Sequence, residues 1–321
     1  MRRPLIFMRA VTFQALLLLF IGGAACGASV AGFPDKPIRV IVPQGIGASA
    51  DILTRTLTVK FADTLGEQLV VENRAGASGM IGLEVVAHAQ PDGYTLLSTS
   101  TGFQVIVPQL QKIAFDPFGD FVPISLFALT QNVVVVHPSL PATLKEFIAY
   151  SKARPGRLNF ASAGSGTQSH LAGVQFSLAT GIDVVHVPYK GGGPLVSAVI
   201  ANESQYSVSP LPAYLAQIRA GRARALGTGG TKRSPQLPEV PTIAEAGVPG
   251  FESTGWAGLM APRRTPQPVL DKLHATLLKV MSRPDMRELI EQQGAESVTA
   301  TPAEFGKFIR AEWDRYGRAI K

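Results

Sequence analysis

The chain has 321 residues, of which 46% are hydrophobic and 17% are charged. This composition excludes an intrinsically disordered chain, because high apolar content with low charge density favours a packed core. The length suits one large domain or two of ordinary size. The net charge of +7 does not indicate a nucleic-acid partner, since three of its positive charges (Arg2, Arg3 and Arg9) lie in the first nine residues and the others form no basic stripe.

Residues 1–31 have the pattern of a signal peptide. The three arginines precede an apolar run from Val11 to Ile21, and small residues follow as far as Ala31. The apolar run is roughly half as long as a bilayer-spanning helix, which favours a cleaved leader over a single-pass anchor. We therefore predict an exported protein.

The only cysteine, Cys26, lies inside this leader. The segment Gly23-Ala24-Ala25-Cys26 weakly matches a bacterial lipidation motif, so a lipid anchor at Cys26 stays open beside cleavage after Ala31. Cleavage after Ala31 would leave no cysteine, which excludes disulfides and thiolate metal sites in the mature chain.

Strand and helix patterns alternate from Pro37 onward. In the first part, β-branched and apolar runs predict strands over 37–42, 68–71 and 94–97, while helical spacing of apolar residues predicts helices over 51–65 and 80–88. Gly66 is expected to end the first helix, and Pro91-Asp92-Gly93 to form a turn. A linker rich in Phe and Pro follows over 115–123.

The same alternation continues after the linker. Strands are predicted over 124–129, 133–137, 158–161, 184–187, near Tyr206 and over 223–227, with helices over 144–152, 168–178, 194–201 and 214–220. A strand-like stretch follows over 254–260. The tail is expected to be mostly helical, with apolar faces over 269–280 and 305–320.

This order of elements predicts an α/β fold with mostly parallel sheets. Because each run of elements is too short for a single sheet built from the whole chain, we predict two lobes with a ligand cleft at the hinge. Lobe 1 would comprise residues 33–130 plus 254–321, and lobe 2 residues 131–253, with helices flanking each sheet.

Loops that follow the predicted strands are the candidate ligand sites, because open parallel sheets bind ligands at the carboxyl ends of their strands. In the first loop, Gly45, Gly47 and Ala50 have the spacing of a dinucleotide fingerprint, but Asp51 would stand where a pyrophosphate should lie. Two interpretations stay open: a turn whose amides face a small anion, with Ser49 or Asp51 capping the helix, or a purely structural tight turn.

The other loops are rich in Gly, Ser and Thr and poor in catalytic residue types. The loop over 161–170 lacks the Gly-x-Ser-x-Gly pattern of a serine hydrolase, and His170 is expected to pack or cap a helix. The five histidines show no metal-ligand spacing, and no carboxylate pair is placed for acid–base work. We predict no catalytic residue, metal or cofactor, and a site that holds a small anion through amides and hydroxyls.

Five segments in chain order carry a family resemblance: 34–43 (PDKPIRVIVP), 71–76 (VENRAG), 91–97 (PDGYTLL), 186–192 (HVPYKGG) and 238–247 (PEVPTIAEAG). Together with Trp256 and Ala261-Pro262, they resemble the Bug, or TctC-like, family of extracytoplasmic solute receptors of tripartite tricarboxylate transporters. The resemblance implies a two-lobed, hinge-closing type II periplasmic-binding fold, a small carboxylate as ligand, and a large and a small membrane subunit as partners. Some relatives are thought to be sensors for a histidine kinase.

The resemblance also implies ligand contacts by position. In the first loop they are Gln44, Gly47, Ala48 and Ser49, and in the loop after the third strand Ser100 and Thr101. In the loops of lobe 2 they are Ser162, Gly164, Ser165, Thr167, Gly191 and Gly192. Gln205 is a further position, at which this sequence departs from the family pattern. Gln44 stands where the family has an aromatic residue, and Ile46-Gly47-Ala48 replaces Pro-Gly-Gly. Gln205 replaces an aspartate, which disfavours an amino-acid ligand.

The predicted function is a periplasmic receptor, expected to be a monomer, that captures a small organic acid and delivers it to a tripartite tricarboxylate transporter. Two alternatives are a sensory or scaffold protein that signals to a membrane histidine kinase, and an exported hydrolase.

Overall fold

The computed structural model describes residues 32–320, so the predicted signal peptide and Cys26 lie outside the described residues. The described residues from Pro34 onward belong to one compact unit. Within the described residues, no helix is both long and apolar enough to cross a membrane.

Sheet A is built from strands at the two ends of the chain. Its order is β2-β1-β3-β9-β4, and β10 also pairs with β4. Its strands are β1 (Ile38–Val42), β2 (Leu69–Asn73), β3 (Thr95–Ser100), β9 (Thr254–Pro262), β10 (Ala295–Ser297) and the first part of β4 (Phe121–Val136). The pairs β1–β2 and β1–β3 are parallel, and the others are antiparallel.

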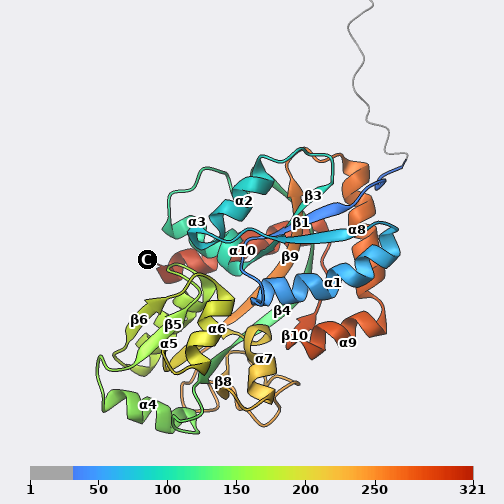
Figure 1. The fold of residues 1–321 in the computed structure, drawn as a ribbon. Helices are drawn as coiled ribbons and strands as arrows, with labels where there is room; N and C mark the ends of the chain where they lie inside the picture. The colour runs from blue at the N-terminus through green and yellow to red at the C-terminus, as the bar shows by residue number, and fades with distance from the viewer. Residues whose placement is uncertain (1–31, 321) are drawn as a thin grey trace, which may run out of the picture. The chain divides into compact units, whose positions relative to one another are not determined.

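Sheet B is built from the middle of the chain and the second part of β4. Its strands are β5 (Asn159–Ser162), β6 (Val185–Pro188), β7 (Tyr206–Pro210) and β8 (Arg224–Thr228). β4 pairs with β9 as far as Gln131 and with β7 from Asn132, so one strand belongs to both sheets. Figure 1 shows β4 running from the elements of sheet A to those of sheet B. We call this passage of β4, together with the start of β9 that pairs beside it, the crossing.

The helices follow the strands in chain order. The elements of the sheet A segments are α1 (Ser49–Leu65), η1 (Ala77–Gly79), α2 (Met80–Ala87), η2 (Gly102–Ile106), α3 (Val107–Leu110), α8 (Gln267–Met281), α9 (Pro284–Gln292) and α10 (Pro302–Ile320). Those of the sheet B segments are α4 (Leu144–Lys152), α5 (Gln168–Thr180), α6 (Gly192–Ile200) and α7 (Leu211–Arg219). Helices α8 and α10 pack on β4, so the C-terminal helices return to sheet A.

Local sequence explains where these helices lie. Leu53, Leu57, Phe61 and Leu65 are buried on one face of α1, and Gly66 ends the helix in the left-handed conformation (φ 90°), as predicted. In α4, Thr143 and Glu146 form a capping box that satisfies backbone amides at the helix start.

Within the described residues, three apolar clusters form part of the core. One contains Leu97, Trp256 and Phe305 and draws its buried members from the segments of sheet A. The other two cover sheet B, and all of their buried members lie between Val133 and Val248. The buried members of each cluster therefore belong to the segments of one sheet, although the half-buried Leu171 of α5 packs against the first cluster.

The predicted α/β fold is confirmed, with two differences in the sheets. The stretches 124–129 and 133–137 form one continuous strand instead of two. The sheets are mixed rather than mostly parallel. β9 is antiparallel to β3 and β4, and β4 is antiparallel to β7. Pairing direction depends on the path of the connection, which strand periodicity does not encode. The strand β10 and the helix α9 were not predicted. β10 has only three residues, and α9 buries only Met286 and Ile290, which is too few apolar residues for a helical pattern.

Candidate functional site

Two small cavities lie where strands of the two sheets end. Their volumes are 40 and 20 Å³, and they share Gln44, Ser49, Ser100, Gln168 and Pro210 as lining residues. Ser100 ends β3, Pro210 ends β7, and Gln44 follows β1. The carboxyl ends of strands from both sheets therefore meet here, where open α/β sheets bind ligands. We call the two cavities together the cleft.

Helix N-termini converge on the cleft. Ser49, Gly102, Gln168 and Gly192, the first residues of α1, η2, α5 and α6, line it, and so does Pro210, which directly precedes α7. The unsatisfied amides and the dipole at a helix start carry partial positive charge. An anion in the cleft would therefore be stabilised from several directions without a cationic side chain.

The side chains that line the cleft are neutral. Among the described residues, none that lines either cavity is charged. The Ser49 and Ser100 hydroxyls and the Gln44 side-chain N–H₂ have no hydrogen-bond partner within the described residues. These groups are donors that can face a carboxylate oxygen.

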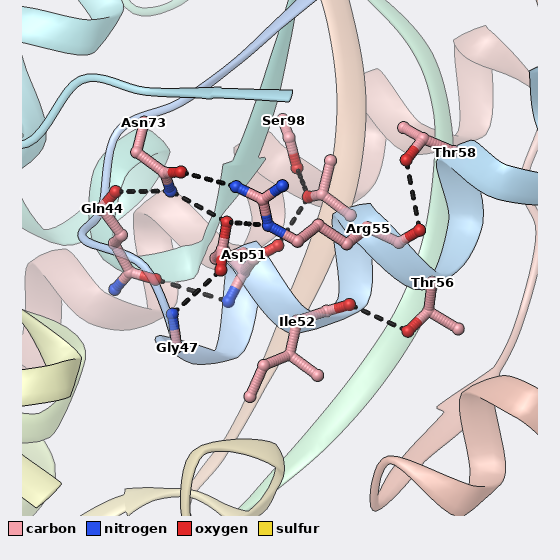
Figure 2. A network of polar contacts seen from close by, with 11 residues as sticks. Gln44, Gly47, Asp51, Ile52, Arg55, Thr56, Thr58, Asn73 and Ser98 are labelled. Atoms are coloured by element: carbon pink, nitrogen blue, oxygen red, sulfur yellow. Dashed lines mark hydrogen bonds and ion pairs between the residues drawn. The ribbon is translucent and has the colours of Figure 1, made fainter. Parts of the chain in front are cut away.

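A buried carboxylate holds the first loop in place (Figure 2). Asp51 Oδ2 accepts the Gly47 amide at 2.9 Å, and Asp51 Oδ1 accepts Arg55 Nε at 2.8 Å and Asn73 Nδ2 at 2.9 Å. The same Asn73 amide donates to the Gln44 carbonyl. The Gly47 amide therefore already has a partner within the protein. It is not available to a bound anion, as the anion-binding interpretation of this loop required. Ser49 makes no capping bond, because the N-cap is Ala48.

Hydroxyls hold the second loop in the same way. Thr167 caps α5 by accepting the His170 amide, and its hydroxyl donates to the Gly164 carbonyl at 2.6 Å. Ser169 Oγ accepts the Ala163 amide at 3.0 Å. The loop between β5 and α5 is thus fixed by its own sequence.

Two histidines stack beneath this loop. His186 Nε2 lies 2.7 Å from Ser162 Oγ, and the rings of His186 and His170 are stacked at 4.0 Å. Burial, together with the charge that His170 would carry, lowers the pKa of His186 to about 4; burial also lowers the pKa of His170. Ser162 is fully buried, so this pair supports the loop from below and does not face the cleft.

Segments of the two sheets touch around the cleft mouth. A Cβ on Gly192 would lie 2.7 Å from the Ala48 Cβ, and a Cβ on Gly191 would lie 3.6 Å from the Gly45 backbone nitrogen. Ser78 Oγ donates to the Ser165 carbonyl at 2.9 Å. Glycine on one side therefore lets the two backbones approach directly.

The structure brings most of the predicted contact residues to this place. Those that line the cleft are Gln44, Ala48, Ser49, Ser100, Thr167 and Gly192. Those in the adjoining loops that do not line it are Gly47, Gly164, Ser165 and Gly191. Thr101 and Ser162 are buried behind the surface, and Thr101 Oγ1 accepts the Trp256 backbone amide.

Gln205 is the exception. It precedes β7, and its side chain accepts the Asn159 amide at 2.7 Å at the start of β5. That is the amino end of both strands, whereas the cleft lies at the carboxyl ends, so Gln205 is not retained in the candidate site. The preference against amino-acid ligands that was based on it loses its structural support.

Sequence reasoning missed several lining residues, most of which carry neither a charge nor a hydroxyl. The cleft is also lined by Gly102, Phe103, Ala163, Gln168, Ser169, Leu195, Ser209, Pro210 and Ala213. Most of these follow a strand directly or lie in the first turn of a helix. The end-of-strand rule would have found them, had it been applied to every residue type.

The fold and this site define the class of solute-binding receptors. The family model "Tripartite tricarboxylate transporter family receptor" matches residues 53–321. The chain belongs to this family, which confirms the resemblance and the prediction of a receptor instead of an enzyme.

Individual relatives are similar over nearly the whole chain. Protein BugT of Bordetella pertussis is 35% identical over 319 residues, which is 98% of each chain. The structure of R. palustris Rpa4515 with adipate has a TM-score of 0.87 at 30% identity and covers 89% of this chain and 97% of that one. MatC from Rhodopseudomonas palustris with bound malate has a TM-score of 0.84 at 31% identity and covers 90% and 100%.

Proposed function

We propose that this protein is a periplasmic receptor that captures a small carboxylate in the cleft and delivers it unchanged to a tripartite tricarboxylate transporter. The observation that carries the proposal is the convergence of helix N-termini and neutral donors on one cleft between two sheets. This arrangement binds a negative charge strongly through fixed dipoles.

The ligands of similar structures support a carboxylate. Adipate and malate, named with two of them, are both small dicarboxylates. The donors of Gln44, Ser49 and Ser100 suit carboxylate oxygens. Specificity for chain length would then depend on the apolar lining, such as Phe103 and Leu195.

We also propose that the cleft opens and closes about the crossing. Lobe 1 would be residues 33–130 plus 254–321, and lobe 2 residues 131–253. The cleft volumes of 40 and 20 Å³ hold only a few waters, so a dicarboxylate requires the lobes to move apart before it enters. Apolar clusters whose buried members belong to one sheet each allow such a movement as rigid bodies.

The partners follow from the same proposal. A monomeric receptor, exported by residues 1–31, would present a surface of both lobes to the large and small membrane subunits when the cleft is closed. Closure would change the surface beside the cleft, where Gly192 meets Ala48 and Ser78 meets Ser165.

A ligand screen tests the function. We expect some of adipate, malate, citrate, benzoate and glutamate to raise the melting temperature of the purified protein, since a ligand at 100 times its Kd stabilises by about 2.7 kcal/mol. The double variant Ser49→Ala/Ser100→Ala should weaken binding about 30-fold, at roughly 1 kcal/mol for each lost hydrogen bond. Ser282→Ala, an exposed serine after α8, should bind as the parent does. Absence of stabilisation by every acid would contradict the proposal.

A further inference from the structure

A second and larger cavity adjoins the crossing. Its volume is 580 Å³, and Thr130 and Trp256 line both this cavity and the cleft. Its remaining walls come from β9, the loop over 230–236 after β8, the end of α9 and the helix α10. We call it the crossing cavity. Its size lies within the usual range of small-molecule sites.

Aromatic rings and unpartnered polar atoms line the crossing cavity. The rings of Trp256 and Phe308 meet edge to face at 6.0 Å, and both residues belong to the lining. Trp256, only 2% exposed, has no partner for its indole N–H within the described residues, and neither has the side-chain oxygen of Gln131. An aromatic wall favours a flat or cationic ligand group.

The charge of the crossing cavity is opposite to that of the chain. Four glutamates and one arginine line it, although the chain carries +7. Arg315 is occupied by a bidentate ion pair with Glu312 at 2.8 and 2.9 Å. The other lining acids, Glu252, Glu291 and Glu296, are exposed and make no ion pair within the described part of the chain.

We propose that the crossing cavity binds a small organic cation, an ammonium with an apolar or aromatic body. The ammonium would face the three unpaired glutamates, and the body would lie against Trp256 and Phe308. Coulomb attraction acts on the ammonium and aromatic packing acts on the body of such a ligand, whereas an organic anion meets repulsion. The cavity therefore selects a charge opposite to that of the cleft ligand.

Binding here would be coupled to the cleft. The loop over 230–236 follows sheet B, whereas α9 and α10 pack with sheet A, so an occupant contacts both. Gln131 already links the two sides, because its Nε2 donates to the Lys232 carbonyl at 3.1 Å. A cation that stabilises this arrangement would alter the affinity of the cleft for its carboxylate ligand. The carboxylate would then alter the affinity of the crossing cavity for the cation by the same factor.

A titration with 2-phenylethylammonium tests the proposal. Fluorescence of Trp256 in a Trp313→Phe background, and calorimetry on the parent protein, should both show saturable binding. 2-Phenylethanol, which shares the body of the probe but carries no charge, should bind at least tenfold more weakly. Ser49→Ala/Ser100→Ala should leave the binding of the amine unchanged, which separates the crossing cavity from the cleft.

Substitution of the acids identifies the site. The triple variant Glu252→Gln/Glu291→Gln/Glu296→Gln should weaken amine binding about threefold or more, because each exposed ion pair contributes about 0.2–1 kcal/mol. Glu239→Gln, an exposed glutamate that does not line the cavity, is the matched control. Since all these positions are exposed, the melting temperature should not change. Absent saturation, equal binding of the alcohol, or an unchanged Kd in the triple variant would each overturn the proposal.

Discussion

At the scale of single residues, the first loop owes its form to one buried carboxylate. Asp51 is 2% exposed and accepts hydrogen bonds from the Gly47 amide, Arg55 and Asn73. Its charge is balanced by Arg55, so it shapes a loop beside an anion site without repelling the ligand. The glycine-rich turn is therefore positioned by a side chain that does not line the cleft.

Asp51→Asn should disturb this loop. An amide offers one acceptor where the carboxylate offered two, so a buried donor loses its partner at a cost of about 1–3 kcal/mol. We expect lower stability in denaturant unfolding and weaker carboxylate binding by calorimetry. Asp63→Asn, an exposed residue in the same helix, should change stability by less than about 0.5 kcal/mol. Equal effects of the two substitutions would show that the Asp51 network does not position the loop.

The stacked histidines predict a dependence of stability on pH. The pKa of His186 falls from 6.5 to about 4 in the folded protein, so the unfolded chain binds a proton at a higher pH than the native one. The contribution of neutral His186 to the free energy of unfolding is therefore fully present above pH 6.5 and decreases as the pH falls towards 4. His186→Gln, which can keep a hydrogen bond to Ser162, should flatten this decrease in unfolding curves recorded from pH 7 to 4.5. Parallel curves for the two proteins would refute the assignment.

At the scale of elements, the start of α6 approaches α1 through glycine. Gly192 has a helical backbone, so alanine suits its conformation, yet the new Cβ would lie 2.7 Å from that of Ala48. The overlap exists only when the two segments are in contact. Closure should therefore be penalised while each helix stays intact.

Gly192→Ala should consequently weaken ligand binding more than folding. Overpacking costs about 1–3 kcal/mol, which corresponds to roughly five- to 100-fold in Kd when it acts only on the closed protein. Gly45→Ala is the control, since its Cβ would meet no atom within 4 Å. Calorimetry measures the affinity and thermal unfolding the stability. Unchanged affinity in Gly192→Ala would mean that the ligand does not require this contact.

The elements also show what the sequence can and cannot predict. Helix α1 was predictable because its buried face and its terminating glycine are both local. The cleft loops could be predicted because they follow strands in sequence. The antiparallel course of β9 and the remote place of Gln205 could not, since both depend on how distant segments pair. Phe103 and Ala213 also follow strands, but an apolar side chain does not by itself indicate a ligand contact.

At the scale of the whole molecule, the ligand should change the separation of the two lobes. The cleft is nearly closed in this structure, with volumes of only 40 and 20 Å³, so the ligand-free protein in solution is expected to sample a wider arrangement. Small-angle X-ray scattering should give a smaller radius of gyration with a bound acid than without it. Ser78→Ala removes a hydrogen bond between the facing segments and should favour the wider form. An identical radius with and without ligand would argue against hinge closure.

The course of β4 also bears on how such a receptor can be taken apart. The chain leaves sheet A at Asn132 and returns at Ser253, and these two residues are joined by a backbone hydrogen bond of 2.9 Å. Residues 132–253 thus form a contiguous insert whose ends emerge side by side and whose apolar clusters are its own. Recombination at this junction could exchange one half of the binding site between receptors while the other half kept its fold.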